Sequence, residues 1–421
     1  MKVFIAAIPF FNTDMAVQAY FLSSQSGDRA LSVKNDFRGR GEALVSPGLE
    51  LLEKVGTEPF AGDAPLFVEI SRLQLLMGYP QNLNMAPGSL ICTIPGGLPA
   101  DSDLLQKCEA LKAQGYALAL ENFPLNGIQS QFFNHATYLF LDYKNPRFEE
   151  VVRAVHLNLK HIQAVVTNVP DMETYQGLCG DPVTKNAWFS GNFYRQPITR
   201  GVAKISPIKV NALQLLKQVN EGDFELSDIA RIIQRDPALS ISLLRFLNSN
   251  PGLSRKIDSI QNAVAILGQQ EVRRWATVAI SVSLAEDRPG EITKLSLVRA
   301  KYAENLAPVF QLGVFQPQLF IAGLFSLLDV ILQKPMTEAI REVSVDQRVY
   351  DALVEQKGML YKVMQFIYAY EHADWAQTSI LLIQNDLDIE QVNAAYIDAL
   401  VWYDQLLRTI DGAGGDGEAP A

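Results

Sequence analysis

Six short apolar runs, separated by polar and helical stretches, constrain the first half of this chain most strongly. They are VFIAAI (3–8), LFVEI (66–70), LICTI (90–94), YALAL (116–120), YLFLD (138–142) and IQAVV (162–166). Continuous apolar runs of this length are typical of strands buried on both faces. Of the helical stretches between them, 101–114 is the clearest, because it begins at Asp101 and ends at Gly115. The alternation predicts βα units around a parallel sheet, and periodicity leaves open whether that sheet is a barrel or doubly wound.

The second half is predicted to be purely helical, and residues 240–275 carry its clearest pattern. Asp236 marks a helix start, and the sequence NSNPG ends that helix. A second helix runs from Ser259 to Gly268, and a third carries Trp275 toward the same core. Further amphipathic helices are predicted at 295–310, 319–332, 360–370 and 388–407.

The change from alternating to purely helical patterning places a domain boundary within residues 189–207. We therefore predict an N-terminal domain over 1–199 and a helical domain over 200–410. The tail 411–421 (DGAGGDGEAPA) is too rich in glycine and too poor in apolar residues to order itself.

Charge and hydropathy exclude several classes of protein. The net charge is −10 with no long basic run, so no nucleic-acid partner is expected. No window approaches ~20 consecutive apolar residues, so we expect no membrane insertion. The N-terminal sequence MKVFIAAIPFFNTD fits a buried strand better than a signal peptide. Three cysteines without metal-ligand spacing are typical of free thiols, and we expect a cytoplasmic protein.

The helical motifs resemble the HDOD domain, a signalling module related to the HD phosphohydrolases but without their metal-binding residues. The matching text is DPALSISLLRFLNS, IDSIQNAVAILGQQEVRRW, LSLVRAKYAENLA and GLFSLLDVIL, between about residues 205 and 375. An HD phosphohydrolase binds metal through a histidine, an adjacent His-Asp pair and a later aspartate, and this chain has four histidines and no His-Asp dipeptide. The resemblance implies a protein-interaction domain, and we single out Arg245, Asn248 and Trp275 as its motif and candidate interaction residues.

In that family the module often follows an EAL-type domain, a TIM-like barrel whose active members hydrolyse cyclic di-GMP with two divalent metals. The segments ALKAQGYALALENF (110–123), YLFLDY (138–143) and WFSGNFYRQP (188–197) resemble EAL motifs, and the resemblance covers about 1–199. It implies an α/β plus all-α fold, in which a TIM-like (βα) barrel of EAL type precedes a helical-bundle HDOD domain.

Carried over position by position, the EAL resemblance leaves few of that family's metal-binding groups. Acids remain at Glu121 and Asp142, and Glu69 stands at an asparagine position. The other motif positions fall on Tyr20 (glutamate), Ser24 (arginine), Thr93 (glutamate), Asn122 (aspartate), Phe140 (lysine), Thr167 (glutamate) and Ser190 (glutamine). Two-metal hydrolysis needs several acidic ligands to balance the charge of the metals. We interpret the three acids as vestigial and expect no catalytic residue, no bound metal and no cofactor.

These observations favour a non-catalytic bacterial signalling scaffold, a pseudo-phosphodiesterase barrel joined to a protein-interaction domain. Its partners would be other signalling proteins, and the sequence leaves self-association open. One alternative is a receptor that binds cyclic di-GMP or a related nucleotide without hydrolysis, and another is a residual phosphodiesterase. Trp375, Trp402 and Tyr403 are candidate partner contacts, with burial in the core as the ordinary alternative.

Overall fold

The structure is a computed structural model. It describes residues 3–26, 46–80, 85–125, 127–196, 207–220, 224–234, 236–248, 257, 259–285 and 288–411. The predicted tail lies outside these residues from position 412 onward.

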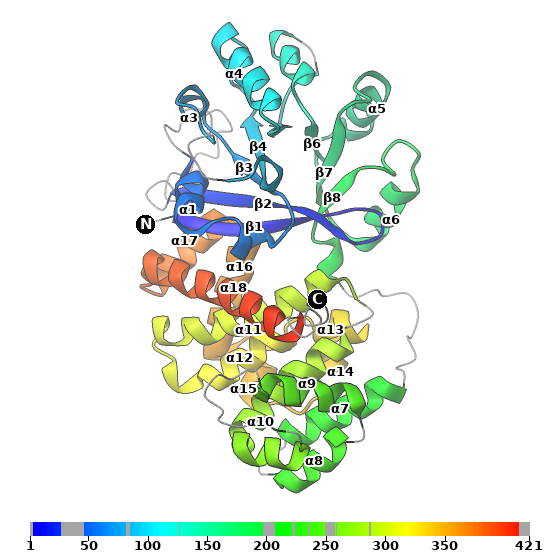
Figure 1. Cartoon of the computed structure of the whole chain (residues 1–421), viewed down its shortest axis with the longest axis vertical. Coiled ribbons are helices and arrows are strands. Elements are labelled where there is room, and N and C mark those ends of the chain that lie inside the picture. Colours follow the sequence, from blue (N-terminus) through cyan, green and yellow to red (C-terminus); the bar gives the residue numbers. More distant parts are fainter. Residues whose placement is uncertain are drawn as a thin grey trace, which may run out of the picture. The chain divides into compact units, whose positions relative to one another are not determined.

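Within the described residues, eight strands close into a barrel in their chain order (Figure 1). They are β1 (Val3–Phe11), β2 (Val17–Ser26), β3 (Leu66–Glu69), β4 (Leu90–Pro95), β5 (Ala117–Glu121), β6 (Tyr138–Asp142), β7 (Gln163–Val169) and β8 (Trp188–Gly191). Neighbouring strands from β2 to β8 run parallel, and β1 is antiparallel to both β2 and β8. Periodicity left open a barrel or a doubly wound sheet, the EAL resemblance implied a barrel, and the structure confirms the barrel.

Two strands, β2 and β8, are not among the six apolar runs. The β2 sequence, VQAYFLSSQS, mixes polar and apolar residues, because part of this strand is only half-buried. The β8 sequence, WFSG, is too short for its pattern to stand out. Strand β1 forms a long hairpin with β2, so the buried-strand prediction for the first residues is confirmed.

Helices surround the barrel between its strands. They are α1 (Pro47–Val55), α2 (Glu58–Ala61), α3 (Arg72–Leu76), α4 (Ser102–Ala113), α5 (Phe148–Asn158) and α6 (Met172–Gly180). The predicted helix at 101–114 is α4, and the Asp101 carboxylate caps it by accepting a hydrogen bond from the Leu104 amide at 2.9 Å.

The remaining elements are helical, as predicted. They are α7 (Pro207–Asn220), α8 (Leu226–Gln234), α9 (Pro237–Asn248), α10 (Ile260–Leu284), α11 (Gly290–Val309), α12 (Gln316–Phe325), α13 (Leu328–Leu332), α14 (Met336–Ala339), α15 (Gln347–Leu353), α16 (Gly358–Glu371), α17 (Trp375–Gln384) and α18 (Ile389–Asp411). Helix α10 packs against α7, α8 and α9, and α11 packs along α12.

Helix boundaries in the 240–275 pattern follow the predicted signals. Asp236 accepts a hydrogen bond from the Leu239 amide at 3.1 Å, at the start of α9. Ser259 caps α10, and Gly268 interrupts that helix with φ 72° and ψ 171°, so the predicted second and third helices are its two arms. The helix predicted at 319–332 is wrong in one respect, since it is divided into α12 and α13. Ser326, between them, donates its hydroxyl to the Gly323 carbonyl at 2.6 Å.

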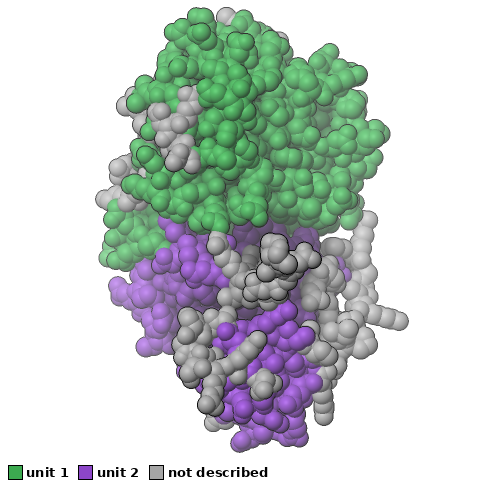
Figure 2. Space-filling view, viewed as in Figure 1, with its two compact units in different colours: residues 1–196, 366–394 green, residues 197–365, 395–421 purple. Residues whose placement is uncertain are grey.

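The chain divides into two compact units, drawn in different colours in Figure 2. One unit contains residues 1–196 and 366–394, and the other contains 197–365 and 395–421. The sequence placed residues 200–410 in a single helical domain, whereas in the structure 366–394 pack with the barrel strands. Among the described residues, none of the helices combines the length and the apolar character needed to span a bilayer.

Candidate functional site

Three carboxylates end three strands of the barrel. Glu69 is the last residue of β3, Glu121 of β5 and Asp142 of β6. Since these strands are parallel, their carboxyl ends lie at the same end of the barrel, which is where TIM-like barrels place their active sites. All three side chains are half-buried. The three positions interpreted as vestigial therefore lie at one end of the barrel.

The inner wall at this end follows from the alternation of side chains along each strand. Phe67, Ala119 and Phe140 belong to the interior cluster, and each lies two residues before one of the three acids. Because alternate residues of a strand face the same side, the acids continue the inward-facing rows of β3, β5 and β6.

One predicted position of this wall faces the other way. Tyr20 lies between Ala19 and Phe21 on β2, and both of those neighbours pack in the interior cluster. The Tyr20 side chain is therefore on the outer face of the strand. The assignment of the family's first-strand glutamate to Tyr20 thus does not match the inner wall, because a shift of one residue along a strand changes the face.

The carboxylate of Asp142 is already hydrogen-bonded within the chain. Its Oδ1 accepts one hydrogen bond from the Lys144 amide at 2.9 Å and one from Asn168 Nδ2 at 2.8 Å. Asn168 lies next to the last residue of β7 in a left-handed backbone conformation, with φ 60°. These contacts fix the Asp142 carboxylate against its own turn and the neighbouring strand.

Aromatic rings fill the barrel beneath the acids. The Phe140 ring centroid lies 5.2 Å from that of Phe67, 5.5 Å from that of Phe10 and 5.9 Å from that of Phe21. Phe140 occupies the position at which the EAL resemblance expects a lysine. A packed ring offers no proton and no charge, so this position can neither activate water nor bind a phosphate.

The neighbouring inward position on β4 is also uncharged. Thr93 pairs with Glu69 in the strand register and is fully buried. Its hydroxyl has no hydrogen-bond partner in the described part of the chain. A single buried hydroxyl replaces the glutamate expected there, and a neutral oxygen is a weaker cation ligand than a carboxylate.

No group of three or more histidine, cysteine, aspartate or glutamate side chains that could hold a metal ion occurs among the described residues. The three acids therefore share one end of the barrel without converging on one three-ligand set.

The candidate residues of the helical unit have different environments. Asn248, at the end of α9, binds both backbone groups of Ile257: its Nδ2 donates to the Ile257 carbonyl at 2.8 Å, and its Oδ1 accepts from the Ile257 amide at 2.7 Å. Trp275 is buried in α10, whereas Arg245 is exposed on α9. Asn248 and Trp275 thus contribute to the fold of this unit, whereas the Arg245 side chain is exposed.

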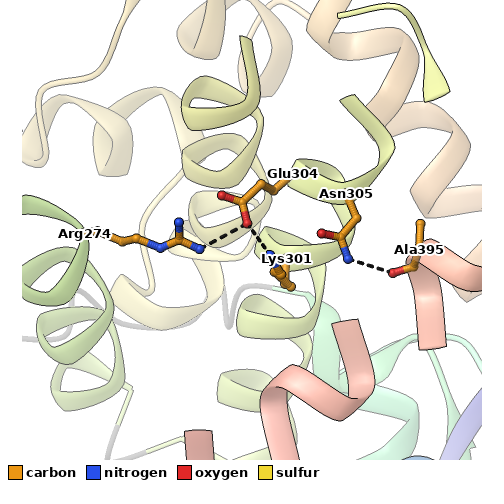
Figure 3. Close-up of polar contacts among 5 residues, drawn as sticks. All are labelled: Arg274, Lys301, Glu304, Asn305 and Ala395. Atoms are coloured by element: carbon orange, nitrogen blue, oxygen red, sulfur yellow. Dashed lines mark hydrogen bonds and ion pairs between the residues drawn. The ribbon is translucent and has the colours of Figure 1, made fainter. Parts of the chain in front are cut away.

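A charged network on α10 and α11 was not singled out from the sequence (Figure 3). Glu304 accepts hydrogen bonds from Arg274 at 3.1 Å and from Lys301 at 2.8 Å. The Arg274 guanidinium also lies over the Phe320 ring, 4.9 Å from its centroid. The spacing of Lys301 and Glu304 could have revealed their pairing, since residues three apart on a helix are neighbours.

Three further polar side chains lie deeper in the same unit. Arg299 is buried and donates from Nη1 to the Ser326 hydroxyl at 2.9 Å. Burial raises the pKa of Asp329, and the Arg299 guanidinium partly opposes that shift. The cluster stabilises the junction between α11, α12 and α13.

Comparisons with known proteins match both halves of the chain. The family model described as "HDOD domain" matches residues 205–365, so the C-terminal part contains an HDOD domain, as expected from its motifs. The uncharacterized protein YuxH of Bacillus subtilis is 27% identical over 419 residues, covering 97% of this chain and 99% of YuxH. The cyclic di-GMP phosphodiesterase CdgJ of Vibrio cholerae is 23% identical over 408 residues, covering 97% of this chain and 94% of CdgJ.

A solved EAL domain protein from Listeria monocytogenes is 12% identical, with a TM-score of 0.34, and the match covers 46% of this chain and 87% of that chain. The similarity to YuxH extends over nearly the whole length of both chains.

Proposed function

We propose that this chain is a cyclic di-GMP signalling protein that acts as a scaffold and does not hydrolyse the nucleotide. The observation that carries the proposal is the inner wall of the barrel, where Phe140 and Thr93 stand at positions that the EAL resemblance assigns to a lysine and a glutamate. Removing one ligand from a two-metal centre leaves the charge of the metals unbalanced. The three remaining acids do not offset that loss.

The helical unit supports the same proposal. The chain has no His-Asp dipeptide for an HD-type metal site. Asn248 and Trp275 stabilise the HDOD fold, and exposed side chains such as Arg245 are left for contact with other signalling proteins.

Two alternatives keep a nucleotide at the barrel. CdgJ, which aligns over 94% of its length, carries the name of a cyclic di-GMP phosphodiesterase, and this favours residual hydrolysis as the second candidate. A receptor that binds the nucleotide and leaves it intact is the third. Neither Ser24 nor Phe140 supplies the cation that would balance a phosphate.

Calorimetry on the full chain separates the three. Cyclic di-GMP is titrated with and without Mg²⁺, and the mixture is then analysed for the linear dinucleotide. The scaffold proposal expects neither heat of binding nor product. Micromolar binding without product would replace it with the receptor.

The residual phosphodiesterase has its own signature. Product would have to disappear in Glu121→Ala, which removes an acid from the end of β5. It would have to persist in Glu109→Ala, which removes an exposed acid from α4 on the outside of the barrel. Capture of partner proteins by the parent chain and by Arg245→Ala then tests the scaffold directly.

A further inference from the structure

Among the described residues, no strand lies beside one edge of β1 over most of its length. Strand β2 pairs with β1 from Val3 to Phe11, but in the described part of the chain β8 pairs with β1 only at Phe11. The first part of β1, VFIAAI (3–8), is apolar and uncharged, and Pro9 beyond it has no N–H to donate to a further strand. An open edge of this composition is a template for pairing with another strand.

Two side chains from the far end of the sequence occupy this edge. The Ile5 amide donates to the Tyr370 hydroxyl at 3.4 Å, and that hydroxyl donates to Asn393 Oδ1 at 2.9 Å. Asn393 Nδ2 donates in turn to the Val3 carbonyl. Since residues two apart direct their backbone groups to the same edge, the Tyr370–Asn393 clasp binds a donor and an acceptor there, as a neighbouring strand would.

Aromatic packing holds the clasp in place. Trp375 stacks on Phe4 with ring centroids 5.5 Å apart and planes 10° apart, and it meets Tyr370 edge to face at 5.5 Å. Its indole N–H donates to the Ser23 hydroxyl on β2 at 3.2 Å. Tyr370 is completely buried, and Asn393 is 8% exposed. Trp375 is therefore part of the barrel unit and is not available to a partner.

The extent of the HDOD domain gives independent support. Its family model ends at residue 365, and residues 366–394 belong to the unit that contains the barrel. The segment after the HDOD match thus belongs to the compact unit of the barrel, although it is distant from the barrel strands in sequence.

We propose that residues 366–394 are an edge cap of the barrel, and that the Tyr370–Asn393 clasp prevents β1 from pairing with β1 of a second copy of this chain. Strand addition at an open sheet edge is driven by main-chain hydrogen bonds. The clasp occupies those hydrogen-bonding groups at Val3 and Ile5.

The test uses two variants of the full chain. Tyr370→Phe keeps the ring that packs on Phe4 and Trp375 and removes only the hydroxyl. Asn393→Leu keeps a similar volume and removes the amide. The matched control is Asn305→Leu, which deletes another helical amide whose Nδ2 donates to the Ala395 carbonyl at 3.1 Å, in the other unit (Figure 3).

Two measurements report on the β1 edge, hydrogen exchange and light scattering. We expect hydrogen exchange of a peptide spanning β1 to become about tenfold faster or more in both clasp variants at low protein concentration. At high concentration the exchange should slow again, and light scattering should show a mass above that of the parent. The Asn305→Leu control should match the parent in both measurements.

Each contrary outcome overturns a stated part of the proposal. Exchange at β1 that equals the control in both clasp variants overturns the clasp. Faster exchange with a mass that stays at the parental value at every concentration overturns the pairing of two copies.

Discussion

At the scale of single residues, two asparagine side chains bind backbone groups that lie outside their own helices. Asn248 binds both backbone groups of Ile257, and Asn393 binds the carbonyl of Val3. An amide side chain carries a donor and an acceptor, so it can replace a backbone partner that is missing. Asn248 was singled out as a candidate interaction residue, yet its contacts stabilise the fold.

Asn248→Ala should lower the free energy of unfolding of the helical unit by about 1–3 kcal/mol, because both backbone groups of Ile257 lose their partner. Urea denaturation measures the change. Arg245→Ala, on the exposed face of the same helix, is the control and should stay within about 0.5 kcal/mol of the parent. Equal stability of the two variants would show that the Asn248 contacts contribute nothing.

Asp329 predicts a pH dependence. Burial raises its pKa above the ordinary value of 3.8, so the folded chain binds this proton more tightly than the unfolded chain does. The resulting stabilisation is complete below 3.8 and is lost as the pH rises through the raised pKa. Between pH 3.8 and neutral pH, the unfolding free energy of Asp329→Asn should therefore fall less than that of the parent chain. Urea denaturation at a series of pH values measures this, and an unaltered slope would contradict the prediction.

The sequence predicted the residues at the barrel mouth better than it predicted the faces on which they lie. Glu69, Glu121 and Asp142 stand at strand ends as expected, because an apolar run ends where the chain leaves the sheet. The position of the family's first-strand glutamate was placed at Tyr20, whose side chain lies on the outer face of β2. The facing of a strand depends on its register with its neighbours, and a pattern as mixed as VQAYFLSSQS does not fix that register.

At the scale of elements, helices begin and end where capping groups and glycine require it. Asp101, Asp236 and Ser259 each accept a hydrogen bond from a first-turn amide, so these starts were predictable. The division of 319–332 into α12 and α13 was not. The break follows from Ser326, which binds both Arg299 and the Gly323 carbonyl, and the Arg299 contact is remote in sequence.

Gly268→Ala should destabilise the helical unit by about 1–3 kcal/mol, because φ 72° with ψ 171° is a conformation that only glycine adopts readily. A Cβ at this position would meet nothing within 4 Å, so the cost arises from the backbone and not from crowding. Thermal unfolding measures it. A melting temperature equal to that of the parent would mean that α10 straightens through this position without penalty.

At the scale of the whole molecule, each compact unit is assembled from two separate parts of the chain. The sequence placed a boundary within 189–207, near the division at 196, but it assumed that each domain is continuous. Helical periodicity shows that 360–370 and 388–407 are amphipathic. It does not show which surface covers their apolar faces, because that depends on contacts remote in sequence, such as the one between Phe4 and Tyr370.

A chain that ends at residue 365 keeps all eight strands and the complete HDOD match, yet it should lose barrel stability. Removing the aromatic cover of Phe4 should cost about 3 kcal/mol or more. Limited proteolysis should then cut within the barrel at a lower protease concentration than in a chain ending at residue 411. Equal resistance of the two chains would mean that 366–394 are dispensable for the barrel.

The edge cap is also synthesised long after the strand that it covers. Asn393 lies 390 positions after Val3, whose carbonyl it binds. At the usual pace of translation, ~5–20 residues per second, the cap reaches the first strand ~20–80 s after that strand has been made. During this interval an apolar strand edge waits uncovered on a growing chain. We therefore expect the free edge of β1 to need protection by another group, such as a chaperone, until residues 366–394 have been made.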